Sequence, residues 1–307
     1  PWGPYLSFSL SEALKRATRA AFRPTRSWWS RGKIRLSKSV AVNLALLCES
    51  LRVPEFSPIW SRYIGLLVPR IATHRFLSDA SYEGIGGWSP CFGIMWRFNG
   101  EDLLFYGFSL KALKGTSSEP ASDKPGLHIN PPEFIACIIN LWLILKLVQL
   151  LPPCPTGYVI DLLSDNTSAL SWLKHSAATR NPLLQPLARF ASALLVHTHQ
   201  FHIRIQPKHI AGKKNDEADA LSRYQNGRLE SWADVTKRCS LLQTCRICLP
   251  PHELLSTLAA LSSCRPIEGT YVDVTTRLLT LDLDFLPSGS NLPAFRSRRL
   301  LLVSIPL

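Results

Sequence analysis

The 307-residue chain is long enough for about two average domains of roughly 150 residues, so a sizeable buried core is expected. Hydrophobic residues form 46% of the chain and charged residues 19%, and these proportions exclude collagen-like, low-complexity and highly charged disordered chains. Lys and Arg total 35 against 22 Asp and Glu, and the net charge of +13 favours a polyanionic partner.

The excess positive charge is concentrated near the N-terminus. Residues 1–75 contain 13 Lys or Arg and 3 Asp or Glu, so this segment accounts for +10 of the +13. The basic side chains are interleaved with Trp28 and Trp29, a composition typical of a segment that faces nucleic-acid phosphates. We therefore interpret residues 1–71 as a basic arm, with a solvated basic linker as the alternative.

Two features bear on the cellular context. Eight cysteines in a chain of this length are too sparse for a disulfide scaffold, which favours a reducing, intracellular compartment. The first residues lack the basic-then-apolar order of a secretory signal. Because the chain starts at Pro1 and Met95 is its one Met, we expect a piece of a longer translation product.

The middle of the chain predicts alternating strands and helices. Asn99 and Gly100 suit a tight hairpin turn between the second and third strands. We expect three antiparallel strands at 75–81, 86–98 and 102–110, followed by a long helix that begins at 133. A fourth strand at 157–166, two helices at 164–175 and 181–199, a fifth strand at 201–206 and a short helix at 215–223 complete the order. This order predicts an α/β domain at 72–225 with a mixed five-stranded sheet and flanking helices.

The C-terminal third is less regular. Amphipathic helical patterns at 228–243 and 250–263 predict a helical segment within 226–307. Beyond Leu286 the chain mixes turn residues, basic residues and apolar residues without a period, so we expect a poorly ordered tail.

One apolar run, residues 134–151, has the minimum length of a membrane-spanning helix. Asn140, Lys146 and Gln149 interrupt it, and the buried helix of a large soluble core has a similar composition. We therefore expect a core helix and no membrane.

Four carboxylates occupy comparable positions at the ends of these elements. Asp79 ends the first strand, Glu133 begins the long helix, Asp165 ends the fourth strand, and Asp219 lies in the last short helix. A crossover connection can place the first and fourth strands side by side, which would make Asp79 and Asp165 neighbours. Each acid alone would be a cap or a surface residue, but acids gathered in apolar surroundings repel one another unless a cation is present.

Carboxylate oxygens without Cys or His suit Mg²⁺, with Mn²⁺ as the alternative. Two such ions activate water and stabilise the leaving oxygen in phosphodiester hydrolysis. The sequence therefore predicts a two-metal site.

Four strings, SDASYEGIGG, INPPEFIA, SDNTSAL and HIAGKKNDEADALSR, resemble in order the motifs of the ribonuclease H domain of retroelement reverse transcriptases. The last string is the most specific, since it matches the pattern G-x-x-N-x-x-A-D-x-L-S-R. The resemblance covers residues 72–225, and among retroelements the motifs are most similar to those of DIRS-type retrotransposons. It implies a ribonuclease H-like fold that hydrolyses the RNA strand of RNA:DNA hybrids.

The resemblance also implies roles for individual residues. Asp79, Glu133, Asp165 and Asp219 would hold two Mg²⁺ ions, and His209 would help to move protons or release product. Ser81, Asn166 and Asn215 would contact the substrate, although capping is the competing role for Ser81 and Asn166. A loop histidine with its own partners is the alternative for His209.

The resemblance further implies partners beyond the substrate. The basic arm would be the end of a polymerase thumb and the connection that follows it. The remaining partner would be the polymerase portion of the same polyprotein.

A second candidate metal site lies C-terminal to this region. Cys239, Cys245, Cys248 and His252 are spaced C-x5-C-x2-C-x3-H, which offers four soft ligands for zinc. The second Cys-x2-Cys pair of a typical zinc site is missing, and the intervening leucines also fit helix packing.

Three other functions remain open. A catalytically inactive scaffold of the same fold would bind nucleic acid without hydrolysis, and a transposase-like or exonuclease-like enzyme would cut DNA. A purely basic interaction protein would be indifferent to Mg²⁺ and would weaken steeply with salt.

Overall fold

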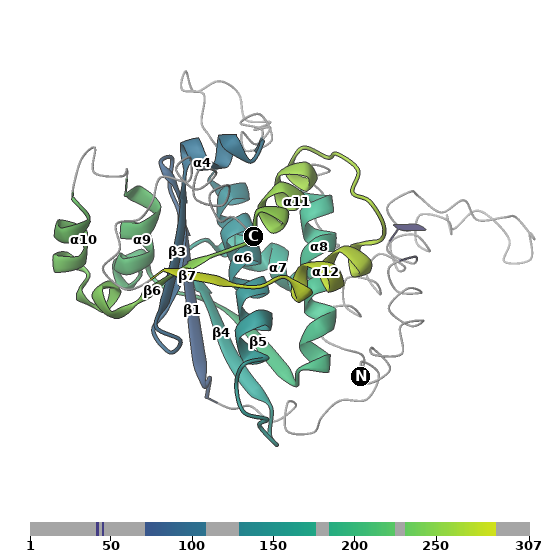
Figure 1. Ribbon diagram of the computed structural model, residues 1–307, viewed down its shortest axis with the longest axis horizontal. Coiled ribbons are helices and arrows are strands. Elements are labelled where there is room, and N and C mark those ends of the chain that lie inside the picture. The colour runs from purple at the N-terminus through teal and green to yellow at the C-terminus, as the bar shows by residue number, and fades with distance from the viewer. Residues whose placement is uncertain are drawn as a thin grey trace, which may run out of the picture.

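The computed structural model describes residues 71–108, 129–175, 184–224 and 231–286, together with Ala41, Val42 and Ala45. The predicted basic arm, except for these residues and Ile71, lies outside the described residues, as does the predicted tail beyond Leu286. The described part is an α/β structure in which helices cover both faces of one mixed sheet (Figure 1).

The sheet has seven strands among the described residues, in the order β5-β4-β1-β2-β3-β6-β7. These are β1 His74–Ala80, β2 Gly84–Ser89, β3 Ile94–Asn99, β4 Tyr158–Ser164, β5 Ile203–His209, β6 Arg246–Leu249 and β7 Asp284–Leu286. The first three strands form an antiparallel meander, and β4 and β5 are added parallel to β1. The carboxyl ends of the parallel strands β1, β4 and β5 therefore lie on the same side of the sheet.

The helices form two layers. In Figure 1, α9 and α10 lie on one side of the sheet, and α6, α7, α8, α11 and α12 lie on the other. Their bounds are α4 Gly100–Phe105, α6 Asn130–Val148, α7 Thr167–His175, α8 Gln185–Gln200, α9 Asp216–Arg223, α10 Trp232–Arg238, α11 His252–Ser262 and α12 Tyr271–Thr280, with short 3₁₀ turns at Gly212–Lys214 and Ser240–Thr244. Each layer has its own apolar core, and the sheet separates the two cores.

Helix α6 is the central helix of the larger core. It is apolar on all sides, as a helix buried by neighbours on every face must be. Its length and hydropathy would suffice to cross a membrane, yet 94% of that window is buried inside the protein. Asn140 is its one fully buried polar side chain among the described residues, and this amide accepts from Trp96 Nε1 at 2.9 Å and donates to the Leu77 carbonyl at 3.1 Å.

The hairpin between the second and third strands differs from the prediction. The chain turns at residues 90–93, where Gly93 adopts a φ of +58°, so the predicted long strand 86–98 is two strands, β2 and β3. Asn99 does not form a hairpin turn. It caps helix α4, whose Asp102 completes a capping box with it, and the predicted third strand at 102–110 begins as this helix.

The additional strands come from the C-terminal segment, and the sheet therefore has seven strands where five were predicted. Strand β6 adds parallel to β3, and β7 adds antiparallel to β6. Leu254 and Leu258 of α11 and Leu278 of α12 are buried in the same core as α6. The segment is thus packed on the sheet and covers the edge that β3 would otherwise expose.

Candidate metal centre

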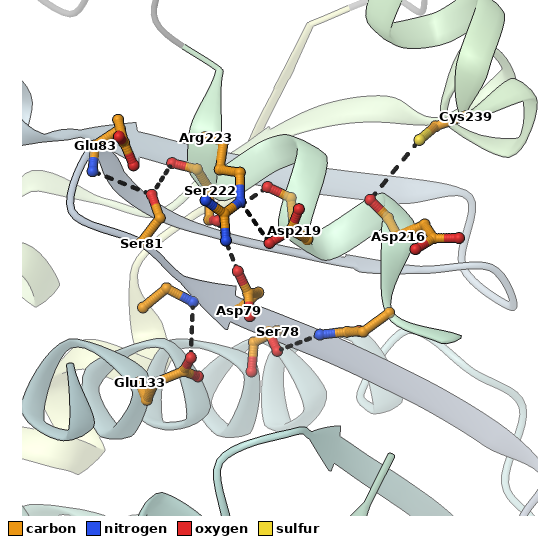
Figure 2. Close-up of polar contacts among 12 residues, drawn as sticks. Ser78, Asp79, Ser81, Glu83, Glu133, Asp216, Asp219, Ser222, Arg223 and Cys239 are labelled. Carbon is orange, nitrogen blue, oxygen red and sulfur yellow. Dashed lines mark hydrogen bonds and ion pairs between the residues drawn. The ribbon is translucent and has the colours of Figure 1, made fainter. Parts of the chain in front are cut away.

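Three of the predicted acids meet at the carboxyl ends of the parallel strands β1 and β4. Asp79 lies near the end of β1, Glu133 in the first turn of α6, and Asp165 directly after β4. One ligand atom from each lies within 4.8 Å of the other two, and this is the one group of its kind found among the described residues. In Figure 2, α9 lies over the Asp79 side chain, and Glu133 approaches from α6 on the other side of β1.

Strand register explains why Asp79 and Asp165 converge. Leu77 on β1 pairs with Leu163 on β4 in a parallel ladder. Each acid follows its leucine by two residues, so both project to the same face of the sheet, one strand apart.

Glu133 reaches the same point from the other layer. Pro131 and Pro132 begin α6, where prolines are tolerated, and they set Glu133 in the first turn. The Glu133 carboxylate accepts from the Ala80 amide at 3.2 Å and from Ser164 Oγ at 3.3 Å. These contacts fix the carboxylate between the ends of β1 and β4.

Burial of the Glu133 and Asp79 carboxylates disfavours their charged forms and raises their pKa values. Glu133 is 3% exposed, and burial, followed by the charges of Asp79 and Asp165, raises the pKa of Glu133 from its ordinary 4.5 to about 9. Burial likewise raises the pKa of Asp79 from 3.8 to about 6, against the opposing hydrogen bond from Ser222. Without a cation Glu133 therefore holds a proton at neutral pH, whereas Asp79 is mostly ionised.

Asp165 is the most accessible member of the cluster, since its side chain is only partly buried. The loop after β5 lies against it, because a side-chain carbon added at Gly212 would stand 3.1 Å from Asp165 Oδ2. A larger residue at Gly212 would therefore crowd this carboxylate.

The donor set fits a hard divalent cation. Three carboxylates supply only oxygen ligands. A cation would offset both the burial and the mutual repulsion that raise the pKa values of Glu133 and Asp79. The geometry does not distinguish Mg²⁺ from Mn²⁺.

The fourth predicted acid, Asp219, lies outside this group of three. It is on α9, 43% exposed, and its Oδ1 forms an ion pair with Arg223 Nε at 2.6 Å. It is nevertheless electrostatically coupled to the cluster, because its charge contributes to the raised pKa of Asp79.

The other predicted site residues lie around the cluster in different ways. His209 is exposed at the end of β5, in register with Ser164. Asn166 caps α7 through the Ala169 amide and donates to Asn130 Oδ1, and Ser81 bonds the Ser222 carbonyl. Asn215 is 1% exposed and donates to the Ser78 carbonyl at 3.2 Å.

Sequence reasoning assigned no role to two serines that bond the cluster directly. Ser164 donates to Glu133, and Ser222 donates to Asp79 Oδ2 at 2.7 Å. Ser222 lies within the most specific sequence string, three residues after Asp219, but nothing in the string alone indicates which strand its hydroxyl meets.

The second candidate metal site, with helix packing as its alternative, is not brought together. Cys239 and Cys245 are buried in the core beneath α9 and α10, whereas Cys248 is buried in the core on the opposite face of the sheet. The reason is that Ile247 and Cys248 are consecutive residues of β6 and point to opposite faces. His252 packs its ring against Tyr106 at 5.1 Å between ring centroids.

Comparisons of the chain with protein-family models, with curated proteins and with solved structures found no match.

Proposed function

We propose that the chain hydrolyses the RNA strand of RNA:DNA hybrids by a metal-dependent mechanism, as the ribonuclease H portion of a retrotransposon reverse transcriptase polyprotein. The observation on which this rests is the meeting of Asp79, Glu133 and Asp165 at the carboxyl edge of parallel strands. The strand order β5-β4-β1-β2-β3, with β1 to β3 antiparallel, is compatible with a ribonuclease H-like fold. The first three sequence motifs contain the three acids of this group, and the fourth motif contains Asp219.

The residues of the cluster have distinct tasks in this proposal. Asp79, Glu133 and Asp165 would hold the cations, and Asp219 is the fourth candidate ligand. When bound, two divalent cations supply activation of water and stabilisation of the leaving oxygen. Glu133 would be held in place by Ser164 and the Ala80 amide, so the chain's own contribution is to fix oxygen ligands in advance.

Substrate choice would depend on the shape of the hybrid and not on its bases. The minor groove of the hybrid presents 2′-hydroxyls on one strand only, which allows RNA to be selected without base readout. His209 and Asn166 lie at the same edge of the sheet as Asp165, and they are the candidates for contact with the sugars and the scissile phosphate.

The test is a cleavage assay with the whole chain, with Mg²⁺ or with EDTA. The substrates are an RNA:DNA hybrid, duplex DNA, duplex RNA and single-stranded RNA. We expect Mg²⁺-dependent cutting of the RNA in the hybrid, leaving 5′-phosphate and 3′-hydroxyl ends. Asp79→Asn should abolish cleavage and keep the circular dichroism spectrum, whereas Glu253→Gln, which changes an exposed acid of α11, should cleave as the wild type does.

Other outcomes would favour the alternatives. Cutting of duplex DNA with the hybrid spared would indicate a transposase-like or exonuclease-like enzyme. Binding of the hybrid without hydrolysis in any divalent cation would indicate an inactive scaffold. Retained cleavage in Asp79→Asn would contradict the assignment of the site.

A further inference from the structure

Ser222 is a buried serine that contacts the carboxylate cluster from a different layer of the protein. Its side chain is on α9 and is fully buried, and its Oγ lies 2.7 Å from Asp79 Oδ2 and 3.0 Å from the Asp219 carbonyl. The two contacts compete, because a hydroxyl has one proton to donate. A carboxylate is the stronger acceptor and the distance to it is shorter, so the proton points to Asp79.

The position of Ser222 is itself fixed from outside α9. Ser81, in the turn after β1, donates its hydroxyl to the Ser222 carbonyl at 2.9 Å, and the Glu83 amide donates to Ser81 Oγ at 3.1 Å. Arg97 Nε on β3 donates to the Leu221 carbonyl at 3.3 Å. Figure 2 shows the contacts that run from Glu83 and Ser81 in the β1–β2 turn through Ser222 on α9 to Asp79.

Close packing of α9 on the sheet makes the contact with Asp79 sensitive to small displacements. A side-chain carbon at Gly86 on β2 would stand 2.6 Å from Leu221 Cβ and 3.1 Å from the Ser222 amide. The absence of a side chain at Gly86 therefore allows α9 to approach within hydrogen-bond distance of Asp79. A shift of one ångström would lengthen the 2.7 Å contact beyond a useful hydrogen bond.

We infer that Ser222 is a positioning residue for the metal site, and this inference rests on the proposed function. Its hydroxyl donates to Asp79 Oδ2, which restricts rotation of the carboxylate that would hold the cation. Hydrogen-bond partners of metal ligands commonly set the orientation of the ligand and raise the affinity for the metal. Because Ser222 is on α9, its contact with Asp79 also fastens the helix that contains Asp219 to β1.

The test measures Mn²⁺ binding directly, by electron paramagnetic resonance of free Mn²⁺ in the presence of the whole chain. Ser222→Ala should weaken Mn²⁺ affinity by about 10- to 100-fold. Ser222→Thr retains the hydroxyl and should recover most of the affinity. Ser262→Ala is the matched control, because Ser262 is also buried in a helix and bonds the carbonyl three residues before it, Ala259, at 2.8 Å.

The outcomes separate positioning from a merely structural role. The melting temperature without metal reports on the loss of a buried hydrogen bond, and it should fall in both Ser222→Ala and Ser262→Ala. Mn²⁺ affinity should fall only in Ser222→Ala. Equal Mn²⁺ affinity in Ser222→Ala and the wild type, or an equal loss in both alanine variants, would overturn the inference and leave the proposed function standing. A wild-type chain that binds no Mn²⁺ would overturn both.

Discussion

Asp79 and Asp165 occupy corresponding positions on adjacent parallel strands, each two residues beyond the paired Leu77 and Leu163. This relationship places two carboxylates one strand spacing apart, roughly 4.8 Å, on one face of the sheet. Like charges at this separation repel, and Glu133 adds a third acid between them. A cation bound by the cluster would therefore stabilise the folded state.

The first prediction concerns Asp165→Asn. Asp165 contributes to the raised pKa values of Asp79 and Glu133, so its neutralisation should remove repulsion and leave the metal-free protein as stable as the wild type, or more stable by about 1 kcal/mol. The rise in melting temperature on adding Mn²⁺ should disappear. Thermal unfolding with and without Mn²⁺ measures both effects, and Glu253→Gln should keep the Mn²⁺ response of the wild type. A Mn²⁺ response retained in Asp165→Asn would contradict the ligand assignment.

The second prediction concerns the pH dependence of stability without metal. The folded protein holds a proton on Glu133 up to about pH 9, whereas the unfolded chain releases it near 4.5, so the folded state binds more protons between these values. Stability should therefore fall as pH rises from about 4.5 to about 9, with an added decline between about 3.8 and 6 from Asp79.

Glu133→Gln separates the two contributions. The variant cannot lose a proton at this position, so its stability should be nearly flat above pH 6, where the wild type still declines. Urea unfolding in EDTA at pH 5, 7 and 8.5 checks this. Parallel curves for the wild type and Glu133→Gln across this range would show that Glu133 does not titrate there.

The third prediction concerns the contact between β2 and α9. Gly86→Ala would bring a carbon within 2.6 Å of Leu221 Cβ, and the overpacking should cost about 1–3 kcal/mol. Because α9 would move away from β1, Mn²⁺ affinity should fall as well. Gly100→Ala is the control, since the nearest atom to its added carbon is 3.7 Å away. Loss of stability without any loss of Mn²⁺ affinity would show that α9 does not position Asp79.

The sequence was sufficient to predict strands at β1, β4 and β5, with Asp79 near the end of β1 and Asp165 directly after β4. Strand β4 is mostly apolar, and β5 alternates apolar and polar residues with Ile203 and Ile205 on one face. The parallel pairing of β1 with β4 places Asp79 beside Asp165. The position of Asp219 outside the group of three could not be predicted, because the sequence does not indicate how far α9 places it from the acids on the other elements.

The errors arose where local patterns are ambiguous. Residues 102–110 contain an apolar run that is too short to show a helical or a strand period, and Asn99 suits a hairpin turn as well as a helix cap. Strands β6 and β7 have four and three residues, and only pairing with β3 and with each other makes them strands. The same pairing directs Cys248 away from Cys245, which the linear spacing of the cysteines could not reveal.

The fourth prediction concerns the C-terminal segment. A chain that ends at residue 224 would lose β6 and β7 and would expose the β3 edge, together with the core surface that Leu254, Leu258 and Leu278 cover. We expect aggregation, because unpaired edges and apolar surfaces associate. A chain that ends at residue 286 should elute from size-exclusion chromatography without aggregates, as the whole chain should. A soluble, folded chain ending at 224 would show that the segment is dispensable for folding.

The fifth prediction concerns the buried amide that fixes α6 to the sheet. Asn140 lies two helical turns after Glu133 on the same face of α6, so its contacts with Trp96 and Leu77 also hold Glu133 at the cluster. Asn140→Leu leaves the Trp96 indole N–H buried without its acceptor, at a cost of about 1–3 kcal/mol. In the Asn140→Leu background, Trp96→Phe removes that donor, so it should cost less than it does in the wild type. The double-mutant cycle, measured by urea unfolding, should give a coupling of about 0.5–3 kcal/mol, and strictly additive losses would show that the Trp96–Asn140 contact contributes no stability.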